Sequence, residues 1–169
     1  MNERIADWPR QHKVLMLACA MIGLVLGTAV VLMVPKSAKI PEQLVSAKNQ
    51  ANYTLYFPQP LPKGFHYKPD SAHVSSAAAL YTLTFGGDKT MSVSIQPKPK
   101  GVVFDDFYDR VLKHKADVFS SEGKAAIGVA DGKTIGSLVT DNVWVLINTS
   151  SSIDGQAMTQ LISNLKPVR

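Results

Sequence analysis

An uninterrupted apolar run dominates the hydrophobic pattern of the chain. It extends from Val14 to Val34 and contains no charged residue, while Lys13 and Lys36 flank it and Pro35 follows directly. A helix rises about 1.5 Å per residue, so this run would be about 31 Å long, close to the thickness of the hydrocarbon core of a bilayer. The pattern therefore predicts a transmembrane helix over 14–34.

We expect this span to stay uncleaved, as a signal anchor. Removed signal peptides have shorter apolar regions followed by small residues, whereas Lys36 and two prolines follow here. Lipid attachment at Cys19 is not expected, because only five apolar residues precede it. Lysines and arginines lie on both sides of the span and do not set its direction. Since short basic tails commonly remain inside, we expect residues 1–13 in the cytoplasm and the rest of this single-pass protein outside the cell membrane.

Alternating apolar and polar residues after the span predict strands. Residues 35–52 are polar without a sustained period and indicate a tether, and the folded region is expected to begin near Tyr53. Further on, one run of alternation turns at Gly86-Gly87 and predicts a hairpin, and a second group of runs predicts a three-stranded meander. Residues 54–57 (TLYF) have strand character, and the other expected strands are Ala79–Phe85, Thr90–Gln96, Ala125–Ala130, Thr134–Thr140 and Val143–Thr149.

A period near 3.6 residues predicts two helices. The first extends over Phe104–Phe119, with Phe107 and Val111 toward a sheet and acidic residues in its first turn. The second covers Gly155–Leu165, with Asp154 as its N-terminal cap. The predicted fold class is α+β: an N-terminal transmembrane helix, then an extracytoplasmic domain over 53–169 built as a twisted antiparallel sheet of five or six strands packed with two helices.

Charge narrows the range of partners. Among residues 36–169 there are 15 basic and 11 acidic residues, giving this part a formal charge of +4. The charges are dispersed, without the stripe of cations and aromatics typical of nucleic-acid binding. We therefore expect no nucleic acid as a partner.

The candidate chemistry is sparse. Three histidines beyond the span, His66, His73 and His114, are isolated in the sequence, and no motif for zinc or calcium occurs. Asp105, Asp106 and Asp109 are interpreted as the solvated start of a helix. We predict no catalytic residue, no metal site and no cofactor, and we do not expect an enzyme.

The span itself carries a candidate packing site. Cys19, Gly23 and Gly27 are spaced by four and share one helical face, and the two glycines form a GxxxG pattern. Small residues let helix backbones approach closely in lipid. The pattern favours a homodimer, or contact with a partner helix, through this face.

The order of a single span, a polar tether, FPQPLPKGF and alternating strands and helices resembles extracytoplasmic domains of bacterial envelope proteins. It is similar to the domains that follow the membrane helix of anti-sigma factors, and loosely to lipoprotein-carrier folds; its most specific part is Leu61-Pro62-Lys63-Gly64-Phe65. Because thirteen residues precede the span, we do not expect a sigma-binding domain or a direct anti-sigma role. We expect a membrane-anchored binding or interaction module of the cell envelope, which uses its sheet, or a groove between sheet and helix, to hold an envelope protein, lipid or polymer. The alternative is a structural subunit of an envelope complex, such as secretion or pilus-like machinery.

Overall fold

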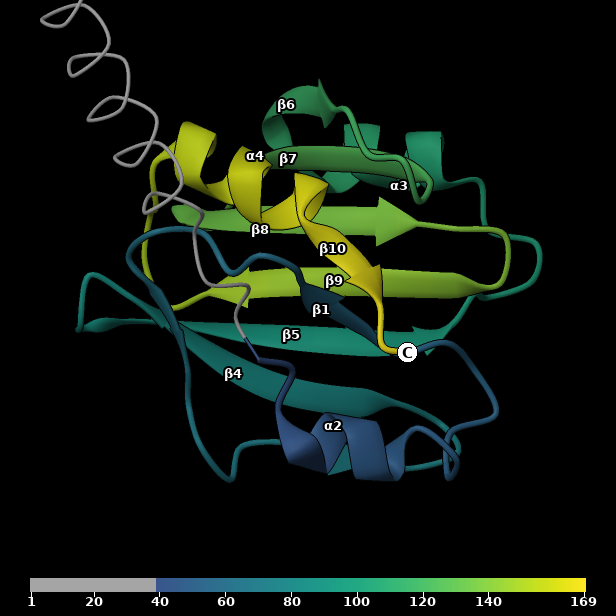
Figure 1. Ribbon diagram of the computed structural model, residues 1–169. Coiled ribbons are helices and arrows are strands. Elements are labelled where there is room, and N and C mark those ends of the chain that lie inside the picture. The colour runs from purple at the N-terminus through teal and green to yellow at the C-terminus, as the bar shows by residue number, and fades with distance from the viewer. Residues whose placement is uncertain (1–38) are drawn as a thin grey trace, which may run out of the picture. The chain divides into compact units, whose positions relative to one another are not determined.

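The computed structural model describes residues 39–169, and strands dominate this part of the chain (Figure 1). It contains three short helices and ten strands. The helices are α2 (Glu42–Ala47), α3 (Phe104–Val111) and α4 (Gly155–Ser163). The strands are β1 (Tyr56–Pro58), β2 (Phe65–Tyr67), β3 (His73–Val74), β4 (Ala79–Phe85), β5 (Lys89–Pro97), β6 (Lys113–Val118), β7 (Lys124–Ala130), β8 (Lys133–Val139), β9 (Val143–Thr149) and β10 (Leu165–Pro167).

Eight of the strands form one antiparallel sheet in the order β2-β4-β5-β9-β8-β7-β6, with β3 also paired to β4. The β4–β5 hairpin and the β7–β8–β9 meander join through β5 and β9, where Ser92 lies opposite Asn148. The remaining strands, β1 and β10, form a separate antiparallel pair. This pair comes from opposite ends of the described chain, so the last residues are fastened to the first strand.

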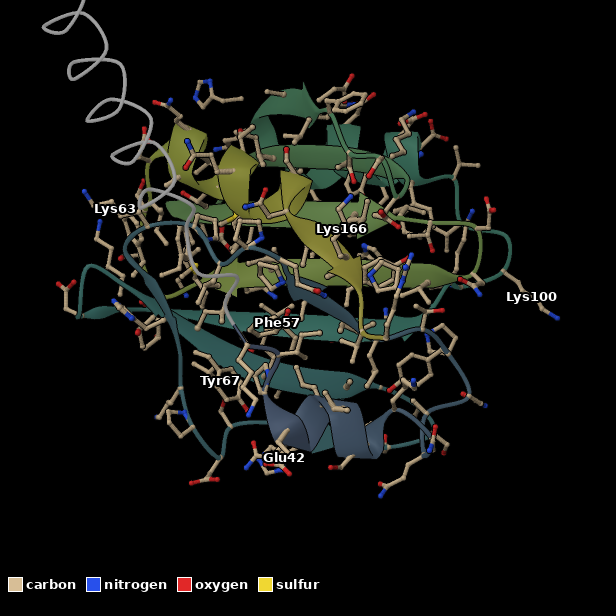
Figure 2. The ribbon with its side chains drawn as sticks, viewed as in Figure 1. Glu42, Phe57, Lys63, Tyr67, Lys100 and Lys166 are labelled. Atoms are coloured by element: carbon tan, nitrogen blue, oxygen red, sulfur yellow. The ribbon has the colours of Figure 1, made fainter. Side chains whose placement is uncertain are left out.

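The main core lies between one face of the large sheet and a layer made of α4, the β1–β10 pair and α2, which stand in front of the sheet in Figure 1. Phe57 of β1 packs over the sheet, with its ring centroid 5.6 Å from that of Tyr81 and 6.0 Å from that of Tyr67 (Figure 2). From α4, Met158, Leu161 and Ile162 are fully buried. This face of the sheet is therefore used entirely for folding.

Glycines let α4 and the residue that follows α3 approach the sheet closely from its two faces. A Cβ added to Gly136 of β8 would lie 2.7 Å from Cδ1 of Ile162 and 2.9 Å from the Sδ of Met158, both in α4. A Cβ added to Gly128 of β7 would lie 2.7 Å from Cβ of Leu112. Real Cβ atoms do not tolerate such distances, so the absence of a side chain sets how near each layer can lie.

A second, smaller core lies on the opposite face. Phe104, Tyr108 and Leu112 are buried there against Ala126 of β7 and Val139 of β8. The spacing of four between the three residues places them on one stripe of α3 and its C-terminal cap. The helix covers β7, β8 and part of β9, and leaves the β4–β5 half of this face open.

The predicted fold class was wrong. The sheet has eight strands rather than five or six, a two-stranded sheet accompanies it, and three short helices replace the two expected. The strand character of 54–57 corresponds in part to β1. The missed strands, β2, β3, β6 and β10, are only two to six residues long, and β2 and β10 lie near or contain prolines, which mask a strand pattern. The hairpin and the meander were predicted correctly, and Asp154 caps α4 by accepting a hydrogen bond from the Ala157 N–H at 3.1 Å.

The predicted helix over 104–119 was also wrong in its second half. The helix ends at Val111, and Leu112 is already extended, with φ of −99° and ψ of 125°. His114 has a φ of +50°, and a bulge follows in the pairing of β6 with β7. Pairing with β7 satisfies backbone groups that the last helical turns would have satisfied, so the apolar periodicity of this segment did not decide its structure.

The predicted span over 14–34, with Cys19, Gly23 and Gly27, lies outside the described residues. Among residues 39–169, no helix combines the length and apolar character that crossing a bilayer requires. Part of the segment expected as a tether, 35–52, belongs to the folded unit. It contains α2, and Leu44 of this helix is fully buried in the main core.

Candidate functional site

Along strands β4, β5 and β9, the open half of the second sheet face carries no Lys, Arg, Asp or Glu. At its edge, His66 of β2 lies opposite Thr84, His73 of β3 lies opposite Leu80, and the Lys68 N–H donates to the Thr82 carbonyl oxygen. Along β4, β5 and β9, the side chains directed away from the main core are hydroxyls, amides and a few apolar groups, and most of them are exposed or half-buried. We call this surface the neutral face. It consists of Leu80, Thr82, Thr84, Thr90, Ser92, Ser94, Gln96, Trp144, Leu146 and Asn148.

Strand pairing arranges the neutral face in rows. Thr82, Ser92 and Asn148 lie opposite one another across β4, β5 and β9, and Leu80, Ser94 and Leu146 form the next row. Neighbouring strands are about 4.8 Å apart, and residues on one face of a strand about 6.7 Å apart. Within residues 39–169 the polar side chains of these rows form no hydrogen bond with other protein groups, so their donors and acceptors are available to a ligand.

A groove of about 360 Å³ borders the neutral face, between α3 and strands β8 and β9. We call it the α3 groove. Its walls are mainly apolar, Asp131 and Lys133 lie at one end, and Leu146 and Asn148 belong to both the groove and the neutral face. The lining residues are Phe107, Tyr108, Val111, Leu112, Ala130, Asp131, Lys133, Ile135, Leu146, Asn148 and Thr149.

A buried polar network fixes the wall of the groove that α3 provides. Trp144 Nε1 donates to Ser137 Oγ at 2.8 Å, and Ser137 Oγ is 3.2 Å from the Val145 carbonyl oxygen, to which it donates. Tyr108 Oη also bonds Ser137 Oγ. Because a serine hydroxyl has one proton, Tyr108 is the donor in that bond, and all bonding positions of Ser137 are filled. Burial raises the pKa of Tyr108, so its hydroxyl keeps the proton that it donates.

Aromatic packing and ion pairs support α3 from its other sides. The Trp144 ring lies edge-on to Phe104 and Phe107, with centroids 5.3 Å and 5.6 Å apart. Asp105 Oδ2 accepts from Lys124 Nζ of β7 at 2.6 Å, and Asp109 Oδ1 from Lys115 Nζ of β6 at 2.6 Å. The helix is therefore held to the sheet along its whole length, and the groove beside it is formed without a ligand.

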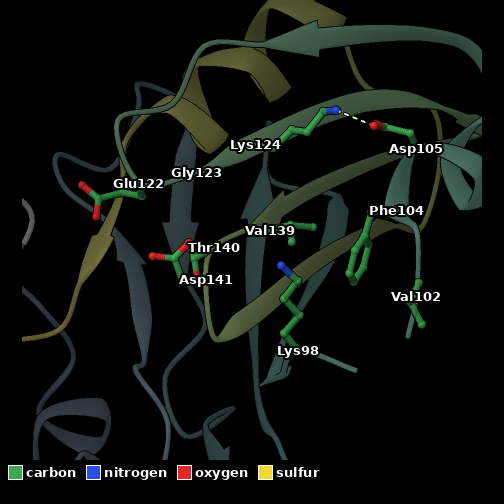
Figure 3. A pocket seen from close by; sticks show the side chains of 10 residues that line it. All are labelled: Lys98, Val102, Phe104, Asp105, Glu122, Gly123, Lys124, Val139, Thr140 and Asp141. Atoms are coloured by element: carbon green, nitrogen blue, oxygen red, sulfur yellow. Dashed lines mark hydrogen bonds and ion pairs between the residues drawn. The ribbon is translucent and has the colours of Figure 1, made fainter. Parts of the chain in front are cut away.

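A second hollow, of about 380 Å³, lies near the β8–β9 turn and is mixed in charge (Figure 3). Lys98, Asp105, Glu122, Lys124 and Asp141 line it. Two of its carboxylates already have partners: Asp105 binds Lys124, and Glu122 binds Lys166, with Oε1 3.0 Å from Nζ. These hydrogen bonds lower the pKa of Asp105 and of Glu122. The pairs hold α3, β7 and β10 in place, so this hollow is a weaker candidate site than the α3 groove.

The three histidines and three aspartates that the sequence offered as candidates for chemistry do not gather into one site. His66, His73 and His114 belong to β2, β3 and β6 respectively. Within residues 39–169 no three metal-ligating side chains gather into a group that could hold an ion. Of the three aspartates, Asp105 and Asp109 form the ion pairs described above. The expectation that the chain has no catalytic residue and no cofactor stays a prediction.

No protein-family model matches the chain, and a search of the curated proteins returns no match. The site has therefore to be interpreted from its own geometry.

The sheet, or a groove between sheet and helix, was expected from the sequence to carry the binding surface, but the residues of the neutral face and of the α3 groove were not predicted. A signal for the face was present, since every polar position of the alternating runs 79–85 and 90–96 is an uncharged residue. The groove had no comparable signal. It depends on the pairing of β5 with β9 and on the end of α3 at Val111, and neither is encoded in local periodicity.

Proposed function

We propose that the chain is a membrane-anchored binding module of the cell envelope, with its folded part outside the membrane. The ligand lies on the neutral face and places an apolar group in the α3 groove. The proposal has two parts: the anchor and the side of the membrane rest on the sequence of residues 1–36, and the binding surface rests on the geometry of residues 39–169.

One observation carries the binding surface. An apolar groove opens directly onto a sheet face that is uncharged, although 26 charged residues occur among residues 36–169. Antiparallel sheets commonly leave one face in water, where charged side chains are frequent. A continuous uncharged surface beside an apolar groove is instead typical of a place where a partner is held.

The exposure of the groove residues agrees with this role. Val111 was predicted to face the sheet, yet 44% of its surface is exposed at the rim of the groove. Leu80, in the row that leads to the groove through Ser94 and Leu146, is 41% exposed. Covering these apolar groups with a ligand would remove them from water and stabilise the complex.

Site-specific photo-crosslinking in intact cells tests the proposal. A photoreactive residue in place of Val111 should capture a defined partner, whereas the same residue in place of Gln160, exposed on the outer side of α4, should not. Leu146→Arg should abolish the adduct at Val111, since it places a charge in the groove. Identical capture from both positions, or an adduct that survives Leu146→Arg, would contradict the proposed site.

A further inference from the structure

The edges of the large sheet are poorly suited to an added peptide strand. At one edge, β6 contains a bulge between Lys113 and Ala116 and carries charged side chains along it. At the other edge, β2 has three residues and β3 has two. Short, bulged and charged edges prevent strand addition. A partner of this sheet is therefore held by side chains on a face rather than by backbone groups at an edge.

The neutral face also lacks the groups that recognise charged polymers and lipid headgroups. Nucleic acids and anionic lipids bind through lysine and arginine side chains that contact phosphate. None of the ten residues of the neutral face is charged, and seven carry a hydroxyl or an amide. The complementary partner is uncharged and rich in hydroxyl groups, which describes a neutral glycan chain.

The α3 groove adds a requirement on the sugars. Phe107, Val111 and Leu146 give it apolar walls, and Asn148 lies where the groove meets the neutral face. An acetamido group combines a methyl group with an amide that both donates and accepts hydrogen bonds. Its methyl suits the apolar walls, and the Asn148 side chain can donate to its carbonyl oxygen and accept from its N–H.

We infer that the neutral face and the α3 groove together bind an uncharged glycan chain that contains N-acetylated sugars. The rows through Ser92 and Ser94 bind sugar hydroxyls, Leu80 contacts the C–H groups of a ring, and the groove takes the acetamido methyl. This inference rests on the proposed function and names the ligand class of the same site.

Two oligosaccharides of equal length and linkage test the inference. Chitohexaose carries acetamido groups and cellohexaose carries hydroxyls in their place. The full chain is kept in a detergent without a sugar headgroup, with Trp8→Phe so that fluorescence reports Trp144 alone, at the rim of the neutral face. We expect saturable binding of chitohexaose and binding of cellohexaose about tenfold or more weaker, since the acetamido contacts are absent.

Matched variants assign the binding to the site. Asn148→Leu should weaken chitohexaose binding about three- to tenfold, as expected for loss of side-chain hydrogen bonds, whereas Asn52→Leu, at another exposed asparagine, should not change it. Ser94→Glu should also weaken binding strongly by placing a charge in the middle of the face. Circular dichroism and the thermal midpoint verify that each variant is folded.

Three results would overturn the inference: equal affinity for the two sugars, no binding of either, or full affinity in both Asn148→Leu and Ser94→Glu. Different results would contradict the proposed function. If the crosslink from Val111 persists but captures a partner without sugar, the binding module stands and the glycan inference falls. If the crosslink is absent as well, both fall.

Discussion

Ser137 is the polar residue that links α3 to the sheet beneath it. Its side chain is fully buried and bonds Tyr108, Trp144 and the Val145 carbonyl, which joins the helix to strands β8 and β9. The hydroxyl therefore serves as the acceptor for two other side chains. No buried side-chain nitrogen or oxygen lacks a hydrogen-bond partner among residues 39–169. Removing this hydroxyl would create such groups where there are none now.

We expect Ser137→Ala to lower the free energy of unfolding by about 1–3 kcal/mol, because Tyr108 Oη and Trp144 Nε1 would lose their acceptor. Ser94→Ala, on the neutral face, removes an exposed hydroxyl and should change it by about 0.5 kcal/mol or less. Urea unfolding of the Trp8→Phe chain, followed by Trp144 fluorescence, measures both. An equal effect of the two substitutions would mean that the network does not hold α3.

Among the helices and strands, those with a local sequence signal could be predicted and those that depend on distant contacts could not. The β4–β5 hairpin could be predicted because its alternating residues and its turn lie within one short segment. Both Gly86 and Gly87 adopt the positive φ expected of that turn. The pairing of β5 with β9 could not be predicted, because it joins segments about fifty residues apart and no local sequence pattern indicates it. The end of α3 was missed for a related reason. The residues of its last predicted turns form β6, which pairs with the distant strand β7 instead of continuing the helix.

The candidate site likewise has a part that local sequence indicates and a part that depends on the fold. The hydroxyl and amide residues of the neutral face could be read from the alternation of each strand, including the Thr82 and Ser92 positions. Their assembly into one surface depends on the order of strands in the sheet. The α3 groove depends in addition on the helix ending at Val111, and it could not have been predicted without the fold.

The contact between α4 and β8 can be tested at the same scale. Gly136→Ala should lower the free energy of unfolding by about 1–3 kcal/mol, because the new Cβ would meet Cδ1 of Ile162. Ile162→Val removes that Cδ1 and alone should cost about 0.5–1.5 kcal/mol. The double variant should be more stable than the sum of the single effects predicts, since each change relieves the other. Strict additivity in urea unfolding would show that the close approach at Gly136 does not limit the packing.

On the scale of the whole molecule, one face of the large sheet stabilises the fold and the other is available for binding. The β1–β10 pair, α2 and α4 pack on the first face and form the main core with it. Pairing of β10 with β1 joins the last strand to the first. The second face needs only α3 to bury the aromatic residues over β7 and β8. A ligand can therefore bind the open half without competing with the groups that hold the fold together.

The proposed placement of this molecule has a direct test, because the chain contains a single cysteine. With Cys19→Ser as background, Ser76→Cys places a thiol in an exposed loop of the folded unit, and Asn2→Cys places one in the N-terminal tail. If residues 14–34 span the membrane with the short tail inside, a membrane-impermeant maleimide added to intact cells should label Ser76→Cys and leave Asn2→Cys unlabelled. Both should react after lysis, which controls for reactivity of each thiol. Labelling of the tail alone would reverse the orientation, and labelling of both in intact cells would mean that residues 14–34 do not separate them. Either result would place the neutral face and the α3 groove in a different environment from the one in which we propose that they bind.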